Sequence, residues 1–529
     1  NRHEPVRALD GPGGDVKANQ WRRVMEFESF CSQLFGKLFA YNTALRKKSE
    51  DLTQEGNYTC NDIFDFYITS NAQSLLLSLW RDLPGSVGIC FNVRCVLEGF
   101  ALKRLCSKKD FPPFQKKLLQ FQYAVLERRC YKKFEDISEI IQPPDNEKQQ
   151  QTIEKFTQII RDNLGEGNVN DILKSNIPFL CDPKVTYHEM IRQELGSDAS
   201  ILYALFSQQI HPSTYEIIPE SVFKILNDGL GDILALIEKE YSTLPDGQES
   251  LVDWWNLVMS ADVSREYNSI MQEETRILYG VKDVFDSTFG EGCYVSHVIR
   301  TLTLLLIEQA GDKLLGLCEQ VKAKWKTLLE LFSSFRYEYN KGMAKEYYDL
   351  MREHFRVKLL SNMEMECSTE KAYAIYSELY PQGCSKEKFD RLFRKTTGYT
   401  INETGQLTSL TQMVSDYLSM FENNQASLDW KKVMRLDYVE SQMISHANGY
   451  MRFANNGAWN DINNIICGTD LGILQMLENI KAVFTIQRDI ENDKRYRRVI
   501  NVTRNSIKKL ELLADRKREI MFYAPQINF

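Results

Sequence analysis

Arg94 and Glu98 are the first pair of side chains in this sequence whose types and spacing could do chemistry. They stand four residues apart in an otherwise apolar segment, which places a guanidinium and a carboxylate on one face of a helix. A charge is buried only when it is paired and hydrogen-bonded, so the pair needs further partners. Two roles fit it: an arginine that stabilises phosphate charge beside a carboxylate, or an ion pair that fixes helix register.

A second group of reactive side chains surrounds one of only 6 histidines. Tyr203, Ser207 and His211 are spaced by four and therefore lie on one side of a helix, and Tyr215 follows. Pro212 disfavours helix at the residue before it, which places His211 near a helix end. There the imidazole can cap the last carbonyls, or it can act as an acid/base in a ligand or catalytic pocket.

The spacing of this group recurs later in the chain. A tyrosine, seven residues, a histidine, three residues and a second tyrosine occur as Tyr203, His211 and Tyr215 and again as Tyr438, His446 and Tyr450. Gln442 stands where the first copy has Ser207, and the segments 187–195 and 410–418 precede the two copies in the same order. Repetition of this kind predicts an internal duplication.

Each predicted unit also holds a segment that is apolar on nearly all sides, 87–100 and 293–306. A helix of that kind is a central one, surrounded by others. Arg300 lies in the middle of the second segment, so we expect it to be the counterpart of Arg94, with Arg352 as the alternative. Leu304 then matches Glu98, which would confine any chemistry of that carboxylate to the first unit.

The composition predicts a helical protein with more than one core. Only 14 Pro and 27 Gly interrupt 529 residues, and apolar residues recur at helical spacing. The expected fold is all-α, with two tandem helical bundles related by internal duplication. The expected divisions are an irregular tail at 1–20, a first bundle at 21–241, a second, divergent bundle at 250–487, and a basic helix and tail at 488–529. The Pro245-Asp246-Gly247 turn marks the boundary between the bundles.

Two locally basic segments, 103–133 and 488–518, stand out in a chain of net charge −7. Aromatic residues interleave with the basic ones in the first segment, which is typical of a surface that contacts RNA or DNA. The alternative is a solvated helix face, and the acidic balance of the whole chain weighs against non-specific binding. The candidate contacts are Lys132, Lys133, Arg497 and Arg498, with Tyr203 and Tyr215 as further candidate binding residues.

Several classes of site are not indicated. The 12 Cys occur without a Cys-x-x-Cys motif and without histidines at metal-finger spacing, so we expect free thiols and no metal. P-loop, Rossmann and Gly-x-Ser-x-Gly signatures are absent, and no cofactor is predicted. No apolar run is long enough to span a bilayer and no signal segment is visible, which predicts a cytoplasmic protein without a membrane partner.

The Arg94-x3-Glu98 and Tyr203-x3-Ser207-x3-His211 patterns together resemble a bacterial family of uncharacterised helical proteins. More distantly, the chain resembles the HEPN superfamily, many of whose members cleave RNA in defence, although the HEPN spacing of His four to six residues after Arg does not occur. The resemblance implies a helical protein that binds nucleic acid or a partner protein in a defence or mobile-element setting. The alternatives are a metal-independent ribonuclease using His211 and Arg94, and a structural scaffold.

Overall fold

The computed structural model describes residues 14–49, 58–82, 86–108, 185–210, 220–290, 293–340, 407–419 and 462–521, together with 399–401 and isolated positions near 151–162, 386–387 and 434–441. These residues are helical, as the composition predicts, apart from one small hairpin. In that hairpin β1 (Tyr399–Ile401) pairs antiparallel with β2 (Leu407–Ser409). No described helix has both the length and the apolar character needed to cross a membrane.

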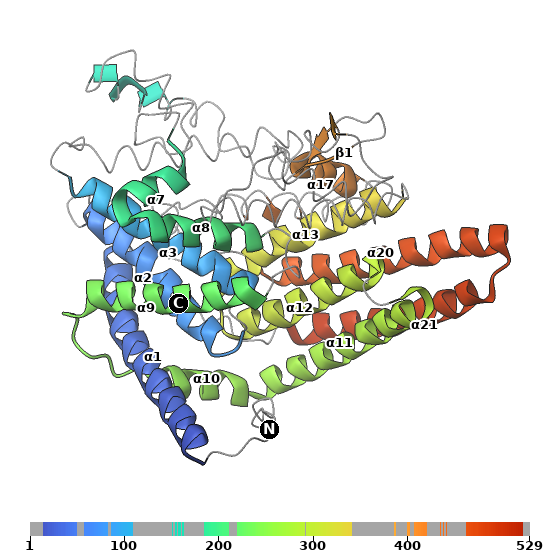
Figure 1. The fold of residues 1–529 in the computed structure, drawn as a ribbon, viewed down its shortest axis with the longest axis horizontal. Helices are drawn as coiled ribbons and strands as arrows, with labels where there is room; N and C mark the ends of the chain where they lie inside the picture. The colour runs from blue at the N-terminus through green and yellow to red at the C-terminus, as the bar shows by residue number, and fades with distance from the viewer. Residues whose placement is uncertain are drawn as a thin grey trace.

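The first half of the chain is built around one buried helix. Its helices are α1 (Gly14–Ser49), α2 (Cys60–Leu79), α3 (Val87–Cys106), α7 (Tyr187–Leu195), α8 (Ser197–Gln209) and α9 (Glu220–Tyr241). Every side chain of α3 from Val87 to Leu102 is buried, and α3 packs against α2, α7 and α8 (Figure 1). The prediction that this segment is a central helix is therefore confirmed.

Local sequence explains where these central helices begin. The Thr59 side chain accepts from the Asp62 backbone N–H while Asp62 accepts from the backbone N–H of Thr59, forming a capping box at the start of α2. The Ser86 side chain caps α3 in the same way by accepting from the Ile89 backbone N–H. Both caps satisfy backbone donors that would otherwise be left unpaired inside the protein.

The described part of the second half is also helical apart from the small hairpin. Its helices are α10 (Leu251–Ser260), α11 (Asp262–Phe289), α12 (Tyr294–Leu314), α13 (Cys318–Asn340), α17 (Leu410–Ser419), α20 (Ile462–Glu491) and α21 (Lys494–Met521). Helices α20 and α21 form a hairpin that extends beyond the rest of the molecule (Figure 1). The boundary predicted at residue 487 falls inside α20, and α21 packs against α20 and α11.

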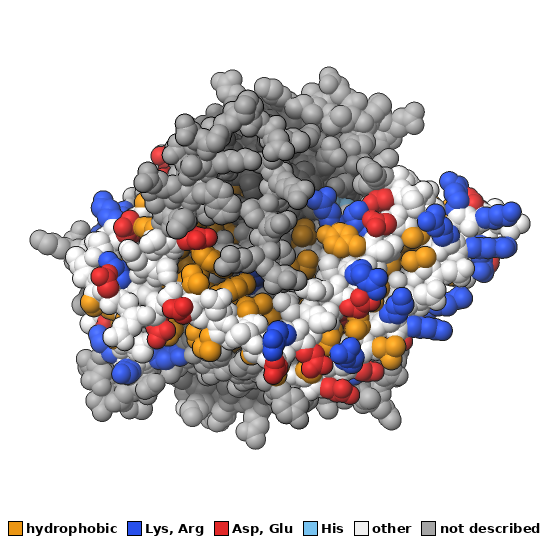
Figure 2. Space-filling model, turned by 90° about the horizontal axis from the view of Figure 1, so that it is seen from below, with side chains coloured by type: hydrophobic (Ala, Val, Ile, Leu, Met, Phe, Trp, Pro, Cys, Tyr) orange, Lys and Arg blue, Asp and Glu red, His pale blue; other side chains and the backbone are white. Residues whose placement is uncertain are grey.

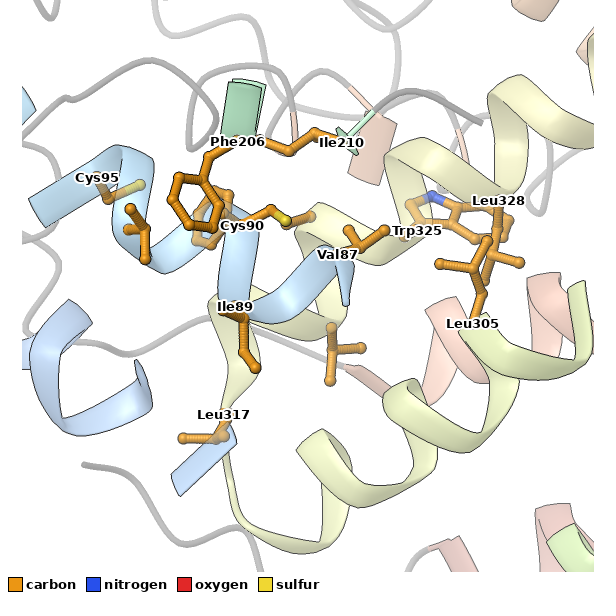
Figure 3. Packing of buried hydrophobic residues seen from close by; sticks show 14 of the residues in the cluster. Val87, Ile89, Cys90, Cys95, Phe206, Ile210, Leu305, Leu317, Trp325 and Leu328 are labelled. Carbon is orange, nitrogen blue, oxygen red and sulfur yellow. The ribbon is translucent and has the colours of Figure 1, made fainter. Parts of the chain in front are cut away.

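The two predicted units share one continuous cluster of buried apolar residues. Figure 3 shows this packing where the halves meet: Val87 and Cys90 of α3 approach the helix that carries Trp325 and Leu328. Trp325 is fully buried. A core that includes residues from both halves means that neither half buries its apolar surface alone.

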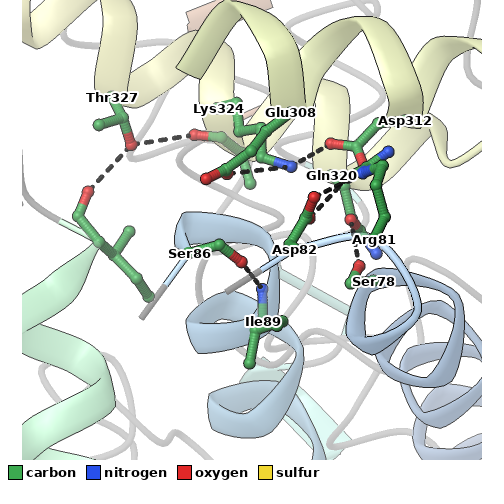
Figure 4. Close-up of polar contacts among 12 residues, drawn as sticks. Ser78, Arg81, Asp82, Ser86, Ile89, Glu308, Asp312, Gln320, Lys324 and Thr327 are labelled. Carbon is green, nitrogen blue, oxygen red and sulfur yellow. Dashed lines mark hydrogen bonds and ion pairs between the residues drawn. The ribbon is translucent and has the colours of Figure 1, made fainter. Parts of the chain in front are cut away.

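Polar groups also cross between the halves. Arg81, after α2, donates to Asp82 and, at 2.8 Å, to Asp312 of α12 (Figure 4). Lys324 of α13 pairs with Asp312 and lies 3.5 Å from Glu308. These charges are largely buried, and removing one of them would leave its partners uncompensated in a low-dielectric interior.

The linker between the halves, residues 242–250, lies directly on α1. A Cβ built on Gly247 would lie 2.0 Å from the Gly36 carbonyl oxygen, so the two backbones touch and no side chain fits at Gly247 without displacement. Lys37 and Asp246 form an ion pair at 3.4 Å, and the hydroxyls of Ser32 and Ser250 are 3.2 Å apart. The turn expected at Pro245-Asp246-Gly247 is thus attached to the first half at several points.

Candidate functional site

The predicted Arg94–Glu98 pair exists and has a third member. Arg94 Nε donates to Glu98 Oε1 at 2.9 Å, and Tyr203 Oη of α8 donates to the same oxygen at 2.7 Å. Arg94 is 8% exposed, Tyr203 7% and Glu98 0%. The prediction that Arg94 is buried and bonded to Glu98 is confirmed, and the tyrosine is one of the further partners that the pair needs.

The electrostatics of this cluster hold it in one protonation state. Burial raises the pKa of the Tyr203 phenol well above its usual range; the Arg94 charge opposes that rise and Glu98 adds to it. Burial works to lower the pKa of Arg94, but Tyr203 and Glu98 outweigh it and raise that pKa. At neutral pH Arg94 is therefore a guanidinium and Tyr203 a phenol, and both donate to the same oxygen of Glu98.

Tyr203 and Ser207 lie one turn apart on α8, as their spacing predicts. The Ser207 hydroxyl oxygen is inaccessible to solvent and has no hydrogen-bond partner within the part of the chain that the structure describes. Helix α8 ends at Gln209, which agrees with the helix end predicted before Pro212. His211 and Tyr215 lie outside the described residues, as do Lys132 and Lys133.

The second-copy prediction needs one correction. Arg300 is exposed on α12, whereas its neighbours Ile299 and Thr301 are buried. It lies on the solvent face of its helix, so the apolar setting that favoured it as the counterpart of Arg94 is not observed. Tyr438 is fully buried. Gln442, His446, Tyr450 and Arg352 lie outside the described residues.

Another lysine and glutamate with the same spacing lie in the middle of α13. Lys326 and Glu330 are four residues apart and buried, at 8% and 3% exposure. Glu330 precedes Tyr438 by 108 residues, close to the 105 residues between Glu98 and Tyr203. The similarity is visible in the sequence only if lysine is accepted in place of arginine, so the Arg-x3-Glu pattern does not predict it.

A third buried cluster holds the base of the α20–α21 hairpin. Lys517 Nζ of α21 lies 2.7 Å from Glu274 Oε2 of α11 and 2.7 Å from Asp470 Oδ1 of α20. Burial raises the pKa of Glu274 to about 7, with Lys517 opposing the rise and Asp470 adding to it. Burial also raises the pKa of Asp470 against the opposing effect of Lys517. Lys517 belongs to the basic segment 488–518, but it is buried and therefore cannot contact nucleic acid.

The outer face of α21 keeps the basic character that the sequence predicts. Between Lys494 and Leu510 the chain has no acidic residue, and all of its lysines and arginines are exposed: Lys494, Arg495, Arg497, Arg498, Arg504, Lys508 and Lys509. The opposite face is buried, with Val499, Ile500 and Ile507 in the core. Lys and Arg side chains gather at this protruding end of the molecule (Figure 2).

Four of these side chains have no ion-pair partner among the described residues. Arg495 pairs with Asp493 at 2.6 Å, but within the described residues Arg497, Arg498, Arg504 and Lys508 form no ion pair. We call the exposed surface made by the seven basic residues between Lys494 and Lys509 the basic face of α21.

No family model, curated protein or solved structure matches this chain. Among the described residues no group of His, Cys, Asp or Glu is placed to hold a metal ion. A functional proposal therefore depends on the geometry of the Arg94 cluster, of Lys326 and Glu330, of the Lys517 cluster and of the basic face.

Proposed function

We propose that this protein binds nucleic acid through the basic face of α21. One observation carries the proposal: seven exposed Lys and Arg side chains occupy a stretch of α21 that contains no acidic residue. Solvated helix faces ordinarily mix both signs of charge, because alternating charges form favourable pairs along the helix. A concentrated positive face instead attracts phosphates and gains affinity by releasing their counterions.

The anchoring of α21 supports this proposal. Its inner face is held by apolar residues and by Lys517, which pairs with carboxylates on two other helices. The helix cannot rotate about its axis without breaking that buried cluster, and the basic residues are thereby kept on the outside. A fixed array of charges loses less conformational entropy on binding than a flexible tail does.

The Arg94 cluster supports a structural role better than a ribonuclease. Arg94 already donates to Glu98, and Glu98 already accepts from Tyr203, inside the core. A catalytic arginine must reach a phosphate that enters from solvent, and this one is directed at an internal partner. We propose that the cluster fixes α8 on α3 and that the protein is a binding protein rather than an enzyme.

Charge reversal on α21 tests the proposal. Wild type and Arg497→Glu/Arg498→Glu would be compared for binding to a fluorescent nucleic acid of mixed sequence at low salt. We expect at least a tenfold loss of affinity in the variant and a shallower dependence on salt, since each lost phosphate contact reduces the slope by about 1. Lys47→Glu/Lys239→Glu, which reverses two exposed charges on α1 and α9, is the matched control and should bind like wild type. Equal loss in both variants, or no binding by wild type at low salt, would overturn the proposal.

We also propose that the two halves arose by duplication, in a register different from the one that Arg300 suggested. A shift of 232 residues, the separation of Arg94 and Lys326, places the ends of α2 and α3 within about three residues of those of α12 and α13. The same shift relates Glu98 to Glu330. Each central helix also packs on its preceding helix and on a short later one, α7 for α3 and α17 for α13.

The contact between the halves supports the same register. A Cβ on Gly88 would lie 3.0 Å from Oε1 of Gln320, and these two residues are related by the 232-residue shift. A residue contacts its own counterpart only near a two-fold axis, which is the arrangement of an isologous dimer. An experimental structure tests this: Tyr438 Oη should lie within hydrogen-bond distance of Glu330, and a different acceptor would contradict the register.

A further inference from the structure

We infer that the ligand of α21 is double-stranded DNA, with the helix lying in the major groove; this inference rests on the proposed function above. The first reason is the chemistry that the basic face lacks. Proteins that bind single strands stack bases on exposed aromatic rings. The one aromatic residue of α21, Tyr496, is buried at 8% exposure and packs against Phe289 and Phe484. Single strands would find charge on this helix but no exposed ring of its own, and the neighbouring Phe289 of α11, 37% exposed, is a single ring rather than a row of them.

The second reason is the order of side chains around the helix. With about 100° between successive residues, Asn501 and Asn505 lie on the midline of the exposed face, and Lys494 lies on the same line at the start of the helix. Arg497, Arg504 and Lys508 flank that midline on one side, and Arg498 and Lys509 flank it on the other. Two amides therefore lie between two rows of cations, over a length of about 20 Å at about 1.5 Å per residue.

This order matches the cross-section of a DNA groove. The major groove of B-form DNA is about 12 Å wide, admits an α-helix, and has a phosphate backbone along each edge and base edges at its floor. Flanking Arg and Lys would contact phosphates on both sides while the central amides face the bases, where asparagine pairs with adenine in a bidentate manner. Duplex RNA has a deep, narrow major groove that side chains cannot read.

The position of the hairpin permits this approach. Helices α20 and α21 reach past the rest of the described helices (Figure 1), and the basic side chains cover the protruding end (Figure 2). The remainder of the chain is net negative, so the basic face stands in contrast to the average charge of the rest of the protein. A duplex can therefore reach the basic face without first meeting the other described helices.

The first experiment compares three ligands of one sequence at low salt: a 20-base-pair DNA duplex, its single strand and the corresponding RNA duplex. We expect the DNA duplex to bind at least tenfold more tightly than either alternative, with Arg497→Glu/Arg498→Glu weakening it and Lys47→Glu/Lys239→Glu leaving it unchanged. Equal or tighter binding of single strands or duplex RNA, still lost in Arg497→Glu/Arg498→Glu, would overturn this inference and leave the proposed function standing. Loss of all binding in wild type would overturn both.

The second experiment tests the midline amides without changing the charge. Asn501→Ala/Asn505→Ala should keep the salt dependence of wild type but lose several-fold in affinity for duplexes containing adenine at the contacted positions, measured across a set of duplex sequences. Asn479→Ala, on α20, is a neutral control. Sequence preferences identical to wild type would remove the asparagines from the interface and overturn the groove orientation.

Discussion

The Arg94 cluster and the Lys517 cluster bury charge in different proportions. In the first, one guanidinium and one phenol serve the single carboxylate of Glu98. In the second, one ammonium serves two carboxylates, Glu274 and Asp470, and all three groups are at most 3% exposed. In the first cluster both donors have Glu98 as an acceptor. The second has one negative charge too many.

That imbalance shows how two buried ion pairs of similar geometry can differ in function. A surplus carboxylate in the core is costly, so the folded state holds a proton there, and the pKa of Glu274 lies near 7 as a result. The Arg94 cluster fixes α8 on α3 over the ordinary pH range. The Lys517 cluster fixes α21 most firmly when it is protonated, and it is this helix that carries the basic face.

The largest expected effect comes from removing the shared cation of the unbalanced cluster. Lys517→Met leaves two carboxylates buried without a counter-charge, and we expect it to lower the free energy of unfolding by about 3–5 kcal/mol at pH 8. Urea unfolding followed by circular dichroism measures this. Arg516 lies on the same helix as Lys517 and forms an exposed ion pair with Glu266 of α11, so Arg516→Met should cost less than about 1 kcal/mol. Equal losses in the two variants would contradict the difference between the clusters.

Arg94→Met should cost somewhat less, about 3 kcal/mol, because Tyr203 still donates to the one carboxylate that remains. The same unfolding measurement applies. Arg94→Met/Glu98→Leu removes both charges and should recover most of the loss, since an apolar replacement of a buried pair is often neutral. If the double variant is no more stable than the single one, the cluster contributes more than charge compensation.

The pH dependence of stability should differ between the two clusters. The folded-state pKa of Glu274 is raised above its unfolded value of 4.5, so its contribution is complete below that pH and is lost as the pH rises through about 7. We expect Glu274→Gln to flatten this decline by on the order of 2 kcal/mol. Unfolding free energies of both proteins at pH 5 and pH 8 measure it. An unchanged slope would show that the proton is held elsewhere.

Tyr203→Phe is expected to have the smallest effect, about 1 kcal/mol, because it removes one hydrogen bond and leaves the Arg94–Glu98 pair in place. Thermal unfolding at neutral pH is sensitive enough to detect it. Tyr496→Phe removes a similar bond to the exposed Glu491 and should cost less. A neutral Tyr203→Phe would mean that Glu98 is satisfied without the Tyr203 hydroxyl.

The part of the Arg94 cluster that sequence could predict is the part set by local spacing. An arginine and a glutamate four residues apart on an apolar helix lie on one face of it, which predicts both that they are buried and that they pair with each other. The tyrosine partner was expected on the correct side of its own helix. Its acceptor, 105 residues away, depended on how α8 packs on α3, which spacing does not encode.

Arg300 and Lys517 are two residues whose burial could not be predicted from their neighbours in the sequence, and the two predictions fail in opposite directions. Arg300 lies among apolar residues in the sequence, yet it occupies the narrow solvent face of α12. Lys517 lies among basic residues, yet its ammonium is buried because Glu274 and Asp470, 243 and 47 residues away, are brought to it. In both cases the neighbours along the chain gave the wrong environment, since burial is decided by elements distant in sequence.

The contact between Gly36 and Gly247 has a consequence for biosynthesis. The linker packs on the middle of α1. This helix leaves the ribosome long before residue 247 does, and domains generally fold from the N-terminus during synthesis. The linker can therefore dock as soon as it emerges, and α10, which also contacts α1, follows it. The second half then begins to fold while its N-terminal end is already held against the first half. This shortens the time during which newly made apolar surface is exposed to other chains.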